Sequence, residues 1–167
     1  MTIFFTVAGP LDIPYYQGKS GRTITDENVE AFWKQHEAHA LKRGCYVFGI
    51  RAGKGYTPAY VGQATNTFKQ EVFSSHKLTR YQQVLADYGK GTPVLFFLVA
   101  PVKRGKPNKA LIGDLEDYLI QTAVSANPDL MNIRGTKAEE WGISGVLRGG
   151  KGKASSAAKA FRKIMKI

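Results

Sequence analysis

The chain has 167 residues, 43% of them hydrophobic and 22% charged, and its 24 Lys and Arg against 13 Asp and Glu give a formal net charge of +11. This length is typical of one domain, and this composition excludes global disorder, a collagen-like repeat and a coiled-coil rod. A single cysteine, Cys45, excludes an internal disulfide and a cysteine-rich zinc site, and it favours a reducing, cytoplasmic location. We expect no membrane segment, because the apolar stretch at residues 1–8 is too short to span a bilayer.

The N-terminal part of the sequence predicts a strand, a loop and a helix. Residues 3–7 are β-prone, and the segment 9–21 is rich in the Gly and Pro of loops. Thr25 or Asp26 can cap a helix whose apolar residues recur at helical spacing. Gly44 is placed to end that helix.

A β-hairpin is predicted next, followed by two helices. Residues 45–50 and 59–62 are β-prone, and the intervening segment 51–58 is rich in turn-forming residues. The spacing of apolar residues then predicts helices over 66–73 and 78–88.

An unbroken apolar run at residues 94–99 predicts a strand that is covered on both faces, in the middle of a small sheet. The segment 101–109 carries four cations and no acid, which suits either a solvated loop or a phosphate-facing one. Asn108 then caps a predicted helix with an apolar stripe, which ends at Asn127-Pro128.

The C-terminal segment, residues 133–167, concentrates the positive charge. It holds nine Lys and Arg against Glu139 and Glu140, a net charge of +7. A Gly-rich stretch at 142–152 leads into a predicted helix whose apolar residues fall on one side: Ala157, Phe161, Ile164 and Met165. This charge favours a polyanionic partner such as nucleic acid, and solubility alone is the plainer interpretation.

Helix periodicity isolates one carboxylate, Glu116, on the apolar side of the helix that Asn108 begins. Its neighbours at helical spacing are Ile112, Gly113, Leu119 and Ile120. A carboxylate facing a core requires a cation, a metal or several hydrogen-bond donors, so Glu116 is a candidate functional residue. The alternative is a structural glutamate that reaches solvent beside Gly113.

Two tripeptides lie on the predicted hairpin, Gly44-Cys45-Tyr46 and Tyr60-Val61-Gly62. A helix follows them, then Glu116 in a later helix, then Asn132. Tyrosines in strands are ordinarily packing residues, but this order and spacing resemble the GIY-YIG nuclease family over about residues 44–132.

The resemblance implies an α/β (α+β) fold with a small three-stranded antiparallel sheet flanked by helices. Residues 44–132 would form this nuclease-like domain. Residues 1–43 would be an N-terminal extension that adds a strand and a helix to the core, and residues 133–167 a basic C-terminal extension ending in a helix. We expect one globular unit.

The resemblance also implies an activity, the metal-dependent endonucleolytic hydrolysis of phosphodiester bonds in DNA, with RNA not excluded. Glu116 would match the metal-binding glutamate, Tyr46 and Tyr60 the motif tyrosines, and Asn132 an asparagine that orients the site. One Mg²⁺ or Mn²⁺ held by a single carboxylate suits a sequence without clustered His or Cys. A tyrosine acting as a base requires nearby positive charge, because its ordinary pKa is about 10.

The sequence departs from the family where the helix after the second tripeptide normally supplies an arginine, because residues 68–73 contain none. Lys69 or Lys77 would supply the charge instead, with poorer geometry for gripping a phosphate. His76 falls where family members often carry a histidine, and Gln63 where some carry a lysine.

Contacts to nucleic acid are assigned to Gly62 and to eight basic residues: Lys77, Arg80, Lys103, Arg104, Lys106, Arg148, Lys151 and Lys153. The alternative function is a non-catalytic nucleic-acid binder on a degenerate scaffold, favoured by the missing arginine and opposed by the retained tyrosines and Glu116. A basic protein of a ribonucleoprotein follows from charge alone and leaves the tyrosine spacing unexplained. The sequence does not indicate an oligomeric state.

Overall fold

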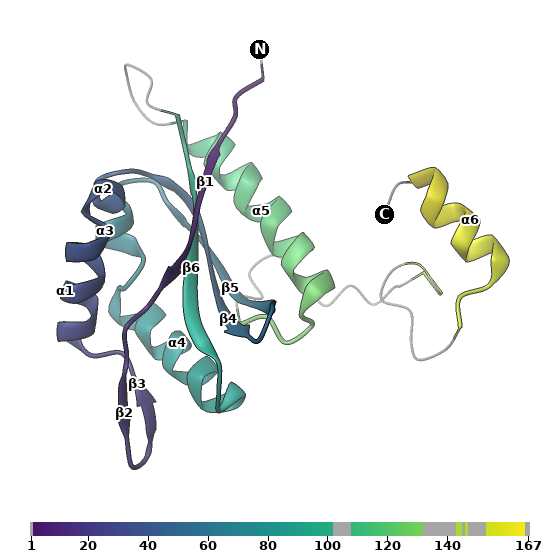
Figure 1. The fold of residues 1–167 in the computed structure, drawn as a ribbon. Coiled ribbons are helices and arrows are strands. Elements are labelled where there is room, and N and C mark those ends of the chain that lie inside the picture. Colours follow the sequence, from purple (N-terminus) through teal and green to yellow (C-terminus); the bar gives the residue numbers. More distant parts are fainter. Residues whose placement is uncertain (1, 102–107, 132–142, 145, 147–152, 166–167) are drawn as a thin grey trace. The chain divides into compact units, whose positions relative to one another are not determined.

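A computed structural model describes residues 2–101, 108–131, 143–144, 146 and 153–165 (Figure 1). The chain divides into two compact units, Met1–Asn132 and Ile133–Ile167. In chain order the elements are β1 (Thr6–Asp12), β2 (Tyr16–Gly18), β3 (Gly21–Thr23), α1 (Asp26–Gln35), α2 (Glu37–Ala40), β4 (Gly44–Ala52), β5 (Gly55–Ala64), α3 (Phe68–Glu71), α4 (Ser75–Tyr88), β6 (Thr92–Val99), α5 (Lys109–Ala126) and α6 (Ser156–Met165).

The first unit is a mixed α+β fold built on one antiparallel sheet with the strand order β1-β6-β4-β5. The sheet has four strands and not the expected three, because β1 pairs with β6 and extends it at that edge. The predicted strand at 3–7 lies at 6–12 instead, and the segment 9–21, expected to be a loop, contains the end of β1 and most of the β2–β3 hairpin. The sequence missed these strands because turn propensity is a local property, whereas the strands form by pairing with other strands.

The first predicted helix begins as expected, with the Thr25 side chain accepting a hydrogen bond from the Asn28 N–H. The helix does not continue to Gly44, because the chain leaves helical geometry at His36 and resumes in the short helix α2. The helices predicted over 66–73 and 78–88 correspond to α3 and α4, with Thr67 capping the former.

The predicted hairpin is present as β4 and β5, and its strands are longer than the sequence indicated. They pair as far as Ala52 and Gly55, so most of the segment 51–58 is strand. Gly53 supplies the left-handed backbone, with φ of 59°, that the tight turn requires.

Helices α1 to α4 lie on one face of the sheet, and α5 lies on the other against β4 and β5 (Figure 1). Strand β6 runs between β1 and β4, inside the sheet as predicted. Val94, Leu95 and Phe97 are fully buried, whereas Phe96, Leu98 and Val99 are half-buried, so the run is covered less completely than the sequence indicated. The larger core fills the α1–α4 face with aromatic side chains. A smaller aliphatic cluster of Val61, Ile120, Ala123 and Leu130 fills the α5 face.

The second unit contains the predicted terminal helix, α6. The Ala158 N–H donates a hydrogen bond of 3.1 Å to Ser155 Oγ at its first turn. Across both units, none of the helices that the structure describes is long and apolar enough to cross a membrane.

Candidate functional site

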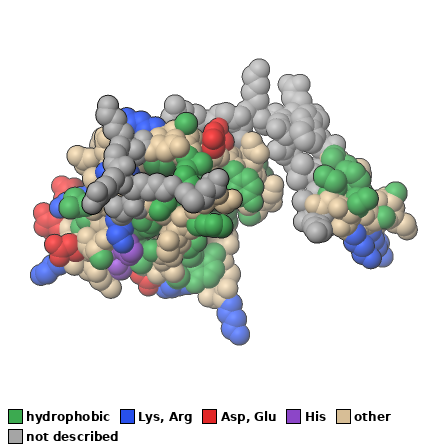
Figure 2. All heavy atoms as spheres, turned by 90° about the horizontal axis from the view of Figure 1, so that it is seen from above, with side chains coloured by type: hydrophobic (Ala, Val, Ile, Leu, Met, Phe, Trp, Pro, Cys, Tyr) green, Lys and Arg blue, Asp and Glu red, His purple; other side chains and the backbone are tan. Residues whose placement is uncertain are grey.

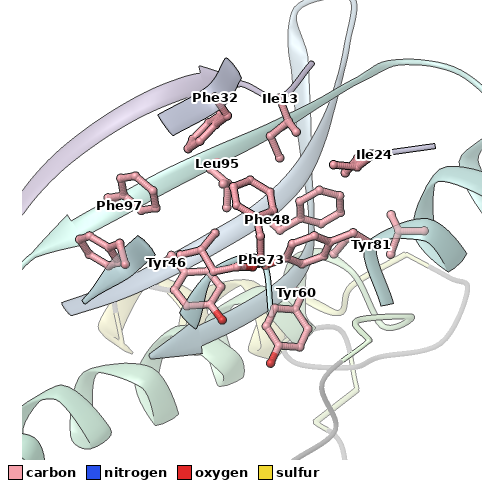
Figure 3. Packing of buried hydrophobic residues seen from close by; sticks show 14 of the residues in the cluster. Ile13, Ile24, Phe32, Tyr46, Phe48, Tyr60, Phe73, Tyr81, Leu95 and Phe97 are labelled. Carbon is pink, nitrogen blue, oxygen red and sulfur yellow. Dashed lines mark hydrogen bonds between the residues drawn. The ribbon is translucent and has the colours of Figure 1, made fainter. Parts of the chain in front are cut away.

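The tyrosines of the two tripeptides lie side by side on the α1–α4 face of the sheet. In the β4–β5 register Tyr46 is opposite Gly62 and Phe48 is opposite Tyr60, so the two tyrosines are diagonal neighbours. Their ring centroids are 6.2 Å apart with an interplanar angle of 30°. Figure 3 shows both hydroxyls on the same side of the aromatic cluster. The structure therefore brings together the two phenols that the sequence singled out.

Gly62 explains why the second tripeptide ends in glycine. A Cβ at this position would lie 2.4 Å from the Tyr46 hydroxyl oxygen, closer than any real contact allows. Gly62 is itself buried, so its observed role is to leave room for the Tyr46 ring. The contact to nucleic acid that the sequence assigned to Gly62 is not favoured by this buried position.

Tyr46 is fully buried, and its hydroxyl has no hydrogen-bond partner of good geometry among the described residues. Burial, together with the nearby phenols of Tyr81 and Tyr60, raises the pKa of Tyr46 far above its ordinary value. The phenol therefore stays protonated, and it can donate a hydrogen bond but cannot act as a base.

Lys77 provides positive charge beside Tyr46. Its side chain is buried, and its Nζ lies 5.3 Å from the centroid of the Tyr46 ring and 3.2 Å from Glu71 Oε2. The Glu71 carboxylate offsets the cost of burying the ammonium group. Lys77 is thus fixed between an acid and an aromatic face.

Arg80 lies one turn further along α4, with its guanidinium carbon 5.8 Å from the centroid of the Tyr60 ring. The side chain is exposed, and its Nη1 donates a hydrogen bond of 2.8 Å to the Met131 carbonyl oxygen. The arginine that residues 68–73 lack is therefore available from α4. Its planar fork has donors beyond the one used by Met131.

Lys69 and His76, the other two candidates near this helix, are both exposed. The His76 Nδ1 lies 3.3 Å from Ser74 Oγ, at the start of α4. This position favours a local role for His76 at the helix terminus.

Glu116 is half-buried on α5, at the opposite face of the sheet from the tyrosines. Cys45 lies close to this part of α5. Its thiol donates a hydrogen bond of 3.3 Å to the carbonyl oxygen of Ile112, one turn before Glu116. Burial, and then the negative charge of Glu116, raise the pKa of Cys45 to about 12. Because Cys45 and Tyr46 are consecutive in β4, their side chains point to opposite faces.

A metal ion at Glu116 would take most of its ligands from water and not from protein side chains. Within the described residues, no three side chains of His, Cys, Asp or Glu gather into a metal-binding group. A lone carboxylate fits Mg²⁺ or Mn²⁺ when water and phosphate oxygens complete the coordination. It does not fit a closed structural site.

Comparisons with family models, with curated proteins and with solved structures gave no match. The functional conclusion therefore rests on the residues of this chain.

Several residues assigned from the sequence lie outside the described part of the chain: Asn132, Lys103, Arg104, Lys106, Arg148 and Lys151. Lys153 is described and exposed, three residues before α6 begins.

Glu71 is a residue of the candidate site that the sequence did not single out. It is six residues before Lys77, a separation that brings no pair together within one helix. The two side chains meet because α3 ends and the chain turns through Val72–Ser74 before α4 begins. Tyr81 lies within the helix predicted over 78–88, and its hydroxyl donates a hydrogen bond to the Val72 carbonyl oxygen at 2.8 Å.

Proposed function

We propose that this protein is a metal-dependent endonuclease of the GIY-YIG type that hydrolyses phosphodiester bonds in DNA. One observation carries the proposal: both tripeptide tyrosines stack beside each other, with Lys77 and Arg80 each within 6 Å of one of their rings. Packing alone does not require two cations beside these rings.

The protonated phenol of Tyr46 acts as a hydrogen-bond donor. Its hydroxyl interacts with that of Tyr81 without a hydrogen bond of good geometry, so it would donate more strongly to a water molecule or a phosphate oxygen. Burial keeps Tyr46 protonated, so the proton of the attacking water would go to Tyr60, whose ring has the Arg80 guanidinium carbon 5.8 Å from its centroid.

Arg80 binds the phosphate. Its exposed guanidinium has a rigid, planar set of donors that suits two phosphate oxygens. Lys77 contributes less net charge, since Glu71 partly neutralises it, and it mainly orients the Tyr46 ring. Further backbone phosphates would meet the basic residues of the chain without reading sequence.

Glu116 would hold the divalent cation, which when bound polarises the phosphate and stabilises the leaving oxygen. Strand β5 is an edge strand, with the tyrosines on one of its faces and α5 on the other. A substrate in contact with all of these groups would therefore bind around the β5 edge.

The alternative is a nucleic-acid-binding protein that does not cut. The complete burial of Tyr46 and the position of Glu116 across the sheet favour this second function. The two functions share the basic surface and differ only in chemistry.

Cleavage of supercoiled plasmid DNA with Mg²⁺ or Mn²⁺ tests the proposal, with Glu116→Gln and Tyr60→Phe as variants. We expect each to lower the rate at least about 100-fold. Asp117→Asn is the matched control, because Asp117 is the exposed neighbour of Glu116 on α5, and it should cut like the unaltered chain. Equal cutting by all of these proteins would contradict the proposal, and tight DNA binding without cutting would support the alternative.

A separate experiment tests which residue supplies the phosphate-binding cation. We expect Arg80→Ala to reduce cleavage at least about tenfold more than Lys69→Ala, because the Arg80 guanidinium lies over the Tyr60 ring and Lys69 is an exposed residue of α3. If Lys69→Ala reduced cleavage more than Arg80→Ala, the phosphate-binding cation would be Lys69 on α3.

A further inference from the structure

Helix α6 separates apolar and basic side chains onto opposite sides. Phe161, Ile164 and Met165 are 43%, 77% and 54% exposed, and their spacing places them in one arc of the helix. Lys159 and Lys163 lie in the opposite arc and are also exposed. Figure 2 shows the two kinds of side chain on opposite sides of this helix, at the right of the view.

A helix of this length is not expected to be stable in water unaided. It has 10 residues, whereas isolated helices shorter than about 12–15 residues are marginal. Of its residues whose side chains are described, only Ala158 is buried. The apolar arc therefore calls for a surface to cover it.

The charge around α6 indicates what kind of surface this is. Residues 141–167 contain seven Lys and Arg and no Asp or Glu. A partner must accept apolar side chains and attract cations in the same place. Duplex DNA supplies the negative charge, but its phosphate backbone gives Phe161, Ile164 and Met165 no apolar layer to enter. The boundary between headgroups and acyl chains in an anionic bilayer supplies both.

We propose that α6 binds the surface of bilayers containing anionic phospholipid. Phe161, Ile164 and Met165 enter the boundary between headgroups and acyl chains, and Lys159 and Lys163 extend their amines to the lipid phosphates. Three apolar side chains are too few for stable binding by themselves, so binding requires both the apolar arc and the charge. This inference does not depend on the nuclease proposal.

Vesicle co-sedimentation of the full chain tests it, with phosphatidylcholine alone compared with an equimolar mixture of phosphatidylcholine and phosphatidylglycerol. We expect at least tenfold stronger binding to the mixed vesicles, and loss of that difference when salt rises from about 50 to about 500 mM. Ile164→Ser should weaken binding about tenfold. Leu41→Ser is the matched control, since Leu41 is also 77% exposed but lies in the first unit, and it should change nothing.

Three results would overturn the inference. One is the absence of preferential binding to the anionic vesicles. Another is equal vesicle binding by Ile164→Ser and the unaltered chain, which would assign α6 to nucleic acid if Lys159→Ala and Lys163→Ala together weaken DNA binding. The third is a lower melting temperature for Ile164→Ser than for Leu41→Ser without lipid, which would mean that protein already covers the apolar arc.

Discussion

The two faces of the sheet differ in how they hold their candidate residues. On the α1–α4 face, Tyr46 sits in a core of fully buried aromatic rings such as Phe48 and Phe97, and Lys77 is buried beside it. On the α5 face, a few aliphatic side chains fill the core, and Glu116 remains half-buried. One face fixes its polar groups by dense packing, and the other leaves its acid within reach of solvent. Substitutions matched across the sheet test this difference.

The largest expected effect is the loss of an aromatic ring from the larger core. Phe97 is fully buried, with its ring centroid 4.3 Å from that of Phe68. We expect Phe97→Ala to lower the free energy of unfolding by about 3–5 kcal/mol, and Ile120→Val on the other face by about 0.5–1.5 kcal/mol. Urea unfolding followed by circular dichroism measures both. A loss for Phe97→Ala well below that range would contradict the dense packing of the larger core.

Replacing a glycine by alanine should change the stability in opposite directions on the two faces of the sheet. Gly62→Ala forces a methyl group against the Tyr46 hydroxyl and should cost about 1–3 kcal/mol. Gly113→Ala on α5 meets no atom within 4 Å and should stabilise the protein by about 0.5–1 kcal/mol through helix propensity. Thermal unfolding of the two variants gives the comparison. A neutral Gly62→Ala would show that the Tyr46 ring moves easily, contrary to the tight packing described above.

The Lys77–Glu71 pair should respond unequally to removal of each partner. Glu71→Gln leaves an ammonium group buried without its counter-charge, so we expect a loss of about 1–3 kcal/mol. Lys77→Met leaves Glu71 able to take up water, because that carboxylate is 34% exposed, and should cost less than about 1 kcal/mol. A double-mutant cycle in urea measures both values and their coupling. Equal losses would contradict the unequal burial of the two partners.

The effect of Cys45 is absent at neutral pH and is confined to alkaline solution. Its pKa is raised to about 12 in the folded protein, against an ordinary value of 9.0, so unfolding releases a proton at high pH. The stability that this thiol contributes is complete below about pH 9 and is lost as pH rises toward 12, by up to about 1.4 kcal/mol per pH unit. The unfolding free energy of Cys45→Ala should therefore fall less steeply above pH 9. Parallel curves for the two proteins would refute the assignment.

The sequence by itself determined the local elements, because caps and apolar periodicity act over a few residues. Asn108 caps its helix as predicted, Thr25 caps the first helix as one of the two residues offered for it, and the apolar run at 94–99 lies in the interior strand β6. The sequence did not determine that Tyr46 and Tyr60 share one face of the sheet, because a register shift between Phe48 and Gly49 separates the turn from the tyrosines.

Only the tertiary structure decided which distant segments meet. It added β1 to the sheet, brought Glu71 to Lys77, put Arg80 over Tyr60, and set Glu116 on the opposite face beside Cys45. No local pattern encodes these contacts, because each depends on how helices and strands far apart in the chain fill the same space.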